Sequence, residues 1–189
     1  MRLGTSLLLA PLLALVLGIA APAAAGIEDY AAYDAPRTCH PQPRPGTEYL
    51  GRWVSRQYGG GYVGFGRPCS RKHGPTSEHQ TGRAFDWSLD ATKRHDRRTA
   101  RALLQRLFAA DGRGHEDALA RRMGIMYLIW DDRMYPAWTG FEPEPYLSSS
   151  CTTRRKCSAT LRHRDHVHVS LSRDGARGLT SWFERRLDR

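Results

Sequence analysis

Two short histidine-containing segments, far apart in the chain, constrain this sequence more than any other feature. Residues 77–86 read S-x-H-x-x-G-x-A-x-D, and residues 163–168 read H-x-x-H-x-H. A histidine and an aspartate from the first segment, joined by a histidine from the second, make a set of three protein ligands that leaves a catalytic zinc ion one open position. We therefore expect a fold in which the two segments meet at one metal site.

The second segment has the alternation of a half-buried β-strand. Polar and apolar side chains alternate in the order His166, Val167, His168, Val169, Ser170 and Leu171. On a strand this places the polar side chains on one face and the apolar ones on the other. An ordinary amphipathic strand with exposed histidines would alternate in the same way, but three histidines in six residues favour a binding role.

In the first segment, Asp86 lies between two aromatic residues on a short predicted strand, Ala84 to Ser88. An acid in this setting is costly to bury unless it is paired or metal-bound. The alternative is a loop histidine and a surface ion pair of Asp86 with Arg83 or Arg94. Together with the second segment, metal binding is the better interpretation.

In this order, the two segments resemble those of one group of zinc peptidases. The group comprises lysostaphin-type endopeptidases, D-Ala-D-Ala peptidases and proteins with the hedgehog fold. The H-x-x-H-x-H segment looks most like that of penicillin-insensitive murein endopeptidases. The resemblance implies that His79, Asp86 and His168 bind Zn²⁺. It also implies an α+β fold, with a small antiparallel sheet and flanking helices, and a carboxypeptidase or endopeptidase that acts on peptidoglycan stem peptides or cross-links.

Three residues near the last ligand are candidates for the base, which takes a proton from water and returns it to the leaving amine. His166 ranks first because strand alternation points it to the metal side. Asp165 is a close second, since its position matches the acidic base of D-Ala-D-Ala carboxypeptidases; alternatively it orients a histidine. His163 matches a murein endopeptidase histidine, or is an ordinary loop residue.

Arg67 is a further candidate for the site. It follows a short predicted strand upstream of the first segment. Members of the resembled family carry an arginine in a comparable place, where it holds the substrate carboxylate or the developing oxyanion. A rigid guanidinium fork suits either task, although a plain surface arginine fits this position almost as well.

The N-terminus has the pattern of a secretory signal. A basic residue precedes an apolar run from Leu7 to Ala21, and a cluster of alanines offers a cleavage site. We expect residues 1–25 to be a removed signal peptide, residues 26–46 an arm, and residues 47–189 a zinc peptidase-like domain. The mature protein is then expected outside the cell or at its wall, without a membrane segment.

Charge and cysteine content agree with an exported protein. The net charge of +10 suggests an anionic partner, such as acidic cell-wall polymers, or simply a solvated arginine-rich surface. Nucleic acid is disfavoured because the basic residues are scattered and no nucleic-acid motif is present. The four cysteines predict disulfides. Three pairings are open, and we favour Cys39–Cys69 and Cys151–Cys157.

Hydrophobic periodicity predicts a mixture of helices and strands. The helices are expected over residues 48–58, 97–110, 116–123 and 178–187, and the strands over 62–67, 84–88, 125–131 and 167–172. Residues 132–162 are expected to form a long loop. The elements do not alternate regularly as β-α-β units, which favours an α+β fold.

Two further function classes compete with a secreted zinc peptidase. One is a non-catalytic, metal-bearing domain for cell-wall binding or signalling. The other is a basic secreted binding protein without a metal. The presence of the candidate bases argues against a non-catalytic domain. Measuring the metal content of the purified protein would distinguish a metal-free binding protein from the other two classes.

Overall fold

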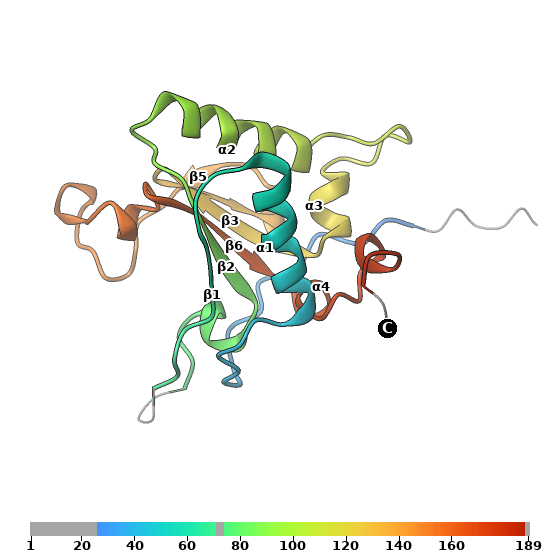
Figure 1. The fold of residues 1–189 in the computed structure, drawn as a ribbon, viewed down its shortest axis with the longest axis horizontal. Helices are drawn as coiled ribbons and strands as arrows, with labels where there is room; N and C mark the ends of the chain where they lie inside the picture. Colours follow the sequence, from blue (N-terminus) through green and yellow to red (C-terminus); the bar gives the residue numbers. More distant parts are fainter. Residues whose placement is uncertain (1–25, 71–73, 188–189) are drawn as a thin grey trace, which may run out of the picture.

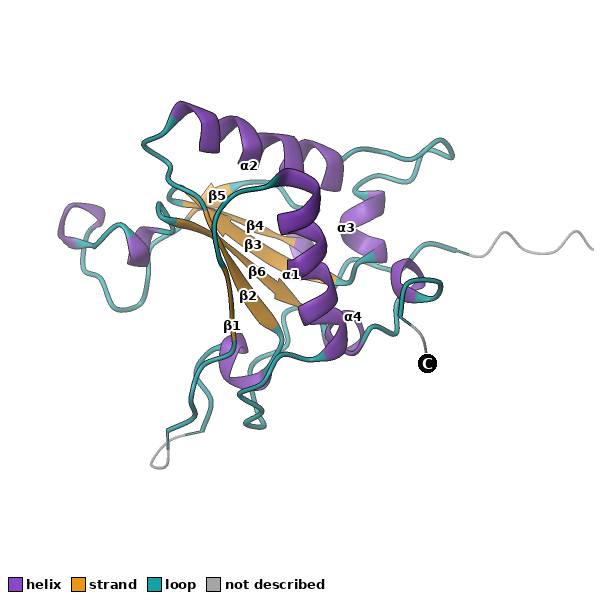
Figure 2. Cartoon of the chain, in the orientation of Figure 1, coloured by secondary structure: helices purple, strands orange, loops and turns teal. Residues whose placement is uncertain are grey.

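The computed structural model of this chain describes residues 26–70 and 74–187. The predicted signal peptide, residues 1–25, lies outside the described residues, so its cleavage stays a prediction. Figures 1 and 2 show a layer of strands with helices packed against it.

An antiparallel sheet forms the centre of the described part of the chain. Its six strands follow the spatial order β1-β2-β6-β3-β4-β5, and neighbouring strands are antiparallel. The strands are β1 Val63–Phe65, β2 Ala84–Ser88, β3 Ile125–Trp130, β4 Arg133–Pro136, β5 Glu144–Pro145 and β6 His166–Leu171. The predicted α+β class with a small antiparallel sheet is confirmed. β3 is buried along its whole length, as expected for a central strand.

Four α-helices flank the sheet in the described residues. They are α1 Pro45–Tyr58, α2 Arg94–Leu107, α3 Ala118–Arg122 and α4 Arg173–Arg177. Figure 1 shows α1 lying across the sheet and α2 running above it. One side of α2 is buried, since Ala100, Leu103 and Leu107 are at most 2 % exposed. The two long helices, α1 and α2, therefore form because their apolar side chains pack into the core on one face of the sheet.

The two faces of the sheet pack against different parts of the chain. The main core joins α1 and α2 to one sheet face, with side chains that include Phe85, Trp87, Val167, Val169 and Leu171. A smaller cluster contains Met126, Tyr127 and Ile129. Because successive side chains on a strand point to opposite faces, Asp86 and His168 lie on the face away from this main core.

The segment before α1 has no helix or strand between residues 26 and 44, as expected for an arm. It nevertheless packs along the domain. Tyr30 Oη donates to Asp117 Oδ2 at 2.7 Å, and Ala31 packs against the smaller apolar cluster. The arm therefore covers part of the sheet face that also carries the two histidine segments.

The predicted helix over residues 178–187 is wrong. Gly178 instead ends α4 in a left-handed conformation with φ of 76°, and only a short 3-10 turn, η5 Ser181–Phe183, follows. Trp182 packs edge-on against Tyr49 of α1, with ring centroids 5.7 Å apart. The apolar residues in this stretch anchor the C-terminal segment to α1, and they do not form a helical stripe.

The segment predicted as a long loop, residues 132–162, contains more structure than expected. It includes β4, β5 and three 3-10 turns, η2 Ala137–Thr139, η3 Arg154–Lys156 and η4 Thr160–Arg162. β4 has four residues and β5 has two. Strands this short leave too little alternation in the sequence to be recognised. They form because β3 offers a backbone with which β4 can pair, and β4 in turn pairs with β5.

Both predicted disulfides are confirmed. Cys39 is bonded to Cys69 and Cys151 to Cys157, with Cα–Cα distances of 6.2 and 5.7 Å. Within the described ranges, none of the helices is both long enough and apolar enough to cross a membrane.

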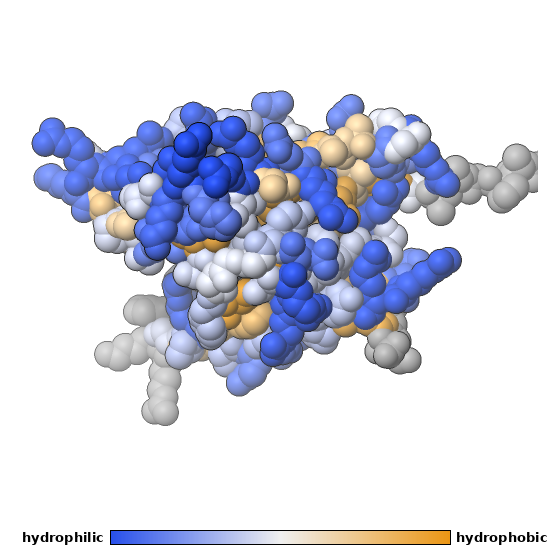
Figure 3. Space-filling view, turned by 45° about the horizontal axis from the view of Figure 1, so that its top comes forward, coloured by the Kyte–Doolittle hydropathy of each residue, from blue (hydrophilic) through white to orange (hydrophobic). Residues whose placement is uncertain are grey.

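Exposed arginines are numerous on the surface. Figure 3 shows hydrophilic residues over most of the visible face, with small hydrophobic areas between them. On α2, Arg98 and Arg101 are among the exposed side chains. Part of the scattered positive charge of the sequence is therefore a solvated surface, as one of the two interpretations above expects.

Candidate metal centre

The pairing of β2 with β6 brings the two histidine segments together. Asp86 lies directly opposite His168 in the register of these strands. His79 comes from η1 Glu78–Thr81, the 3-10 turn that precedes β2 and is capped by Gly82 with φ of 70°. A Cβ atom at Gly82 would meet a backbone oxygen at 2.2 Å, so only glycine fits this turn. The three residues that the sequence predicted as ligands therefore meet at one place.

Three donor atoms form a nearly equilateral triangle. His79 Nε2 is 3.1 Å from Asp86 Oδ1 and 3.1 Å from His168 Nδ1. His168 Nδ1 is 2.9 Å from Asp86 Oδ1. Among the described residues, these three form the group of His, Cys, Asp or Glu side chains that could hold a metal ion.

This donor set fits zinc. In a tetrahedral site with bonds of ~2.1 Å, the donor atoms lie ~3.4 Å apart, which is close to the separations in the triangle. Two imidazole nitrogens and a carboxylate oxygen are donors that zinc accepts readily. His168 Nε2 lies 2.8 Å from Ser170 Oγ. A proton on Nε2 would bond to Ser170 and leave the lone pair of Nδ1 facing the triangle.

Burial and hydrogen bonding set the charge of these groups. Burial alone would raise the pKa of Asp86, but hydrogen bonds with His168 and His79 outweigh it and lower that pKa. Burial lowers the pKa of His168. The carboxylate is therefore ionised and the imidazole of His168 neutral, which are the protonation states that bind metal ions.

The triangle is open on one side. The side chains of His79 and His168 are only 5 % and 7 % exposed, whereas that of Asp86 is 31 % exposed. A small molecule can therefore approach from the side of Asp86. Catalytic zinc sites usually have three protein ligands and one open position, whereas structural sites are usually closed by four protein ligands. The three candidate ligands and the partly exposed Asp86 are compatible with the first type.

Tyr127 and Glu78 lie beside the two candidate ligand histidines, and the sequence alone did not indicate a role for either of them. The Tyr127 ring stacks on the His168 ring, with centroids 5.6 Å apart and planes inclined by 21°. Tyr127 Oη donates to Glu78 Oε2 at 2.7 Å. Glu78 is 5 % exposed, and its Oε1 has no hydrogen-bond partner in the described residues. Its place beside His79 in the first segment was the available signal.

His166 faces the triangle, and Asp165 lies behind it. His166 Nε2 is 3.5 Å from Asp86 Oδ1, while its Nδ1 is 2.7 Å from Asp165 Oδ1. Burial would raise the pKa of Asp165, but hydrogen bonds from Thr160 and His166 outweigh this effect and lower it. An ionised Asp165 therefore orients the His166 ring so that the other nitrogen points toward the triangle.

His163 also lies beside this group. Its ring centroid is 4.7 Å from that of His166 and 5.6 Å from that of His168. Burial, reinforced by the charges of the neighbouring histidines, lowers the pKa of His163 to about 2. Its Nδ1 is buried without a hydrogen-bond partner among the described residues. A neutral ring that is already packed between other rings is a weaker candidate for the base than His166.

Arg67 is the predicted site residue that the structure does not bring into this group. It is exposed, on the coil after β1. Its guanidinium forms no hydrogen bond or ion pair within the described ranges. Its role toward a substrate stays a prediction.

Comparison with known proteins places the chain in a family. The family model for the VldE C-terminal domain matches residues 39–155. The chain belongs to this family. The region matched by the VldE C-terminal domain includes η1 and β2, with His79 and Asp86, and ends before β6, which carries His168. No curated protein and no solved structure matches the chain.

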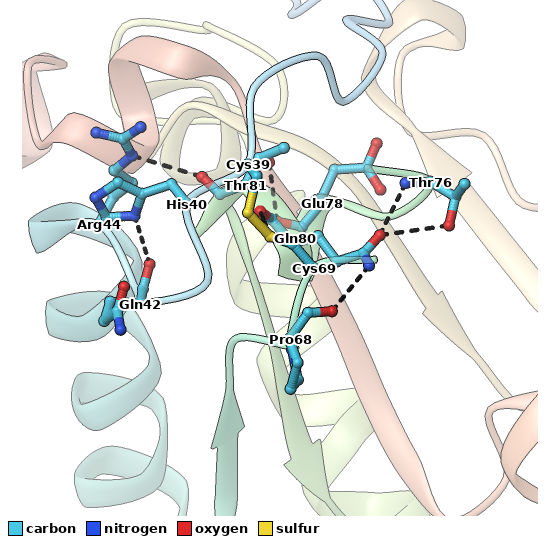
Figure 4. The surroundings of a disulfide bond; sticks show 10 residues. All are labelled: Cys39, His40, Gln42, Arg44, Pro68, Cys69, Thr76, Glu78, Gln80 and Thr81. Carbon is cyan, nitrogen blue, oxygen red and sulfur yellow. Dashed lines mark hydrogen bonds between the residues drawn. A yellow bond between two sulfur atoms is a disulfide. The ribbon is translucent and has the colours of Figure 1, made fainter. Parts of the chain in front are cut away.

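A disulfide within the region matched by the VldE C-terminal domain holds the turn that carries the first histidine. Figure 4 shows Cys39–Cys69 lying against η1. The backbone N–H of His40 donates to the Gln80 carbonyl at 2.7 Å. The Gln80 side-chain amide donates to the Pro68 carbonyl at 3.0 Å. Both chain segments joined by the disulfide therefore bond to η1 as well.

Removing this disulfide should weaken both the fold and zinc binding. The double variant Cys39→Ser, Cys69→Ser opens a loop with a sequence separation of 30, which costs about 3–4 kcal/mol of unfolding free energy in the chain-entropy view. Zinc affinity should fall because η1 is less firmly held. Chemical unfolding and zinc titration measure the two effects.

The second disulfide provides the matched control. Cys151→Ser, Cys157→Ser opens a shorter loop, with a separation of 6, and no hydrogen bond, ion pair or ring contact joins this loop to η1 within the described residues. Its zinc affinity should stay close to that of the unaltered protein. Equal losses of zinc affinity in the two double variants would contradict a specific role of Cys39–Cys69 at η1.

Proposed function

We propose that this protein is a secreted zinc-dependent peptidase that hydrolyses an amide bond in peptidoglycan stem peptides or cross-links. The observation that carries the proposal is the triangle of His79 Nε2, Asp86 Oδ1 and His168 Nδ1, with donor separations of 2.9–3.1 Å. A histidine–aspartate pair lies next to its open side. Ligand and base candidates are therefore present at one accessible site.

The proposed fold family is that of the hedgehog and D-Ala-D-Ala peptidases. Support comes from the small antiparallel sheet and from the order of the ligands along the chain. A turn, the strand after it and a distant strand supply one ligand each. The order follows the two sequence segments that carry the resemblance.

The chemistry divides between the metal and the chain. Zinc held by His79, Asp86 and His168 would act as a Lewis acid and lower the pKa of water bound to it to roughly 7. His166, oriented by Asp165, would accept a proton from the attacking water and pass it to the leaving amine. Proton transfer by a positioned side chain contributes ~10²–10⁴-fold to the rate.

The substrate class and the location rest on other observations. Peptidoglycan is proposed as the substrate because the two segments resemble those of peptidoglycan peptidases. Export is proposed because the N-terminus has the pattern of a secretory signal. The two disulfides support an oxidising compartment. The basic surface suits a cell wall with acidic polymers.

A non-catalytic metal-bearing domain for cell-wall binding or signalling is the second candidate. It would need the ligand triangle alone. The 2.7 Å contact between His166 and Asp165, beside the open side of the triangle, favours catalysis over this alternative. A domain that only binds has no use for an oriented proton acceptor.

Digestion of purified peptidoglycan tests the proposal. The zinc-loaded protein should release soluble fragments with new amino termini, a chelator should abolish the release, and added zinc should restore it. The identity of the fragments tells a carboxypeptidase from an endopeptidase. If the protein binds zinc but no peptidoglycan is cleaved in a chelator-sensitive way, the non-catalytic alternative would be favoured. If the protein binds no zinc, both the peptidase proposal and the metal-bearing alternative would be refuted.

A further inference from the structure

A group of arginines lines a hollow close to the candidate metal centre. The hollow has a volume of about 380 Å³, and its charged lining residues are Asp131, Asp132, Arg133, Arg154, Arg162 and Arg164. They come from the turn between β3 and β4, from the loop closed by Cys151–Cys157, and from the segment before β6. Sequence reasoning assigned no role to any of them.

The turn between β3 and β4 is tied to the histidine segment. Asp131 and Asp132 have φ values of 46° and 65°, as both central residues of a two-residue type I′ turn require. The backbone N–H of Asp131 donates to the His163 carbonyl at 2.8 Å, and that of Asp132 donates to the Arg162 carbonyl at 3.1 Å. The hollow is therefore held in a fixed position relative to His163, whose ring lies 5.6 Å from that of His168.

Two of the four arginines are neutralised within the turn. Arg162 donates two hydrogen bonds to Asp132, at 2.8 and 2.6 Å. Arg164 donates to Asp131 at 2.9 Å. The hydrogen bond from Arg162 lowers the pKa of Asp132 despite its partial burial, and the charge of Arg154 acts in the same direction. These pairs are structural, because they join the turn to the segment that leads into β6.

The other two arginines are unpaired. Arg133 and Arg154 are exposed, and their guanidinium groups form no hydrogen bond or ion pair with the described residues. Four arginines against two aspartates leave the hollow a net charge of +2. Guanidinium groups form strong, often two-pronged hydrogen bonds with carboxylates and phosphates. A concave site with two free guanidinium groups therefore suits an oxyanion.

The positive surface continues beyond this hollow. A second hollow of about 230 Å³ shares Asp131 and Arg133 with the first, and Arg97 and Arg101 of α2 lie on its other side. An anion that is part of a larger molecule can therefore extend from the first hollow toward α2. Because the two hollows adjoin, an anionic group attached to a larger substrate fits this surface better than a free ion does.

We propose that the hollow binds a carboxylate or phosphate group of the cell-wall substrate and so anchors that substrate beside the metal centre. The identity of the substrate rests on the proposed function, whereas the binding of the oxyanion does not. Arg133 and Arg154 supply the free charge. The disulfide Cys151–Cys157 holds the loop that presents Arg154.

Binding is tested on the zinc-loaded protein by NMR titration with two probes, inorganic phosphate and N-acetyl-alanine. The backbone amides of residues 131–133 and 153–156 should shift with both probes or with one. Arg133→Gln and Arg154→Gln should each weaken binding at least about tenfold, since a hydrogen bond to a charged group contributes about 1.5–3 kcal/mol. A preference for phosphate indicates a phosphate polymer, and a preference for N-acetyl-alanine indicates a peptide carboxylate.

Arg98→Gln is the matched control, because it removes the same charge from an exposed position outside both hollows. It should bind the probes as the unaltered protein does. Thermal unfolding should show that Arg133→Gln and Arg154→Gln remain folded, since neither guanidinium forms a hydrogen bond or ion pair in the described part of the chain. Absence of shifts at residues 131–133 and 153–156, or equal affinities in all variants, would overturn the proposal.

Turnover on peptidoglycan fragments then tests the anchoring role. Arg154→Gln should raise KM and leave kcat nearly unchanged, as expected when an interaction is present in both ground state and transition state. An unchanged KM would overturn the anchoring role. The titration needs no turnover, so failure of the peptidase proposal would leave the oxyanion site to be judged by its own result.

Discussion

Zinc affinity should fall by more than ~100-fold when His79 or His168 is replaced by alanine. Changes to groups that merely orient a ligand already cost 10–100-fold, and removal of a ligand leaves only two protein donors. His79 Nε2 and His168 Nδ1 lie 3.1 Å apart, each near Asp86 Oδ1, so neither has a substitute in the triangle. Metal analysis after dialysis and competition with a chromogenic chelator measure the affinity.

His95→Ala is the matched control for these variants. His95 is an exposed histidine at the start of α2, outside the triangle. The control should retain about one zinc per chain with unaltered affinity. Full zinc retention in both His79→Ala and His168→Ala would show that this triangle is not the metal site and would remove the basis of the proposed function.

The meeting of His79, Asp86 and His168, the three candidate ligands, illustrates what the sequence can and cannot predict. The alternation from His166 to Leu171 predicts a strand with both histidines on one face, and that strand is present as β6. Nothing in the sequence specifies that Asp86 pairs with His168. That register depends on packing of the apolar faces of β2 and β6 against α1 and α2, which is a property of the whole fold.

The supporting residues were harder to predict for a related reason. Tyr127 belongs to an apolar run that indicates only a buried strand. Its contact with His168 depends on the irregular pairing of β3 with β6, where the register shifts between Ile125 and Tyr127. Glu78 is linked to this group of residues through the hydrogen bond that Tyr127 donates to it. Contacts between distant segments of this kind leave no local pattern in a single sequence.

The hollow lined by arginines could not be predicted from the sequence for the same reason. Its charged residues come from three separate stretches of the chain, and in the sequence each stretch looks like an ordinary solvated surface. The pairs Arg162–Asp132 and Arg164–Asp131 join residues about 30 positions apart in the sequence. Scattered charge in a sequence therefore does not exclude a concentrated site in the fold.

The choice between His166 and Asp165 as base is the point at which the structure adds most to the sequence. The sequence leaves both open, because each occupies a position used by some members of the resembled family. In the structure, His166 Nε2 lies 3.5 Å from Asp86 Oδ1, and Asp165 contacts the other ring nitrogen at 2.7 Å. His166 is therefore nearer to the candidate metal centre, and under the proposed function we expect His166 to be the base and Asp165 to act through it as a positioning residue.

Replacing His166 by alanine should leave zinc bound and reduce kcat by ~10²–10⁴-fold, the usual contribution of a positioned proton acceptor. Asp165→Asn should cost less, about 10–100-fold, as expected when an orienting carboxylate is lost. Both values are measured on a peptidoglycan fragment whose cleavage by the unaltered protein is chelator-sensitive. Zinc analysis of each variant shows whether the loss lies in proton transfer or in metal binding.

The order of the two effects decides between the residues. A larger loss in Asp165→Asn than in His166→Ala would make Asp165 the base, and the His166 ring would then be its support. Near-normal turnover in both variants would leave His163 as the remaining candidate, since its ring lies 4.7 Å from that of His166. His163→Ala should then lose most of the activity, whereas with His166 as base it should retain more activity than His166→Ala, because His163 serves only to pack against the other two rings.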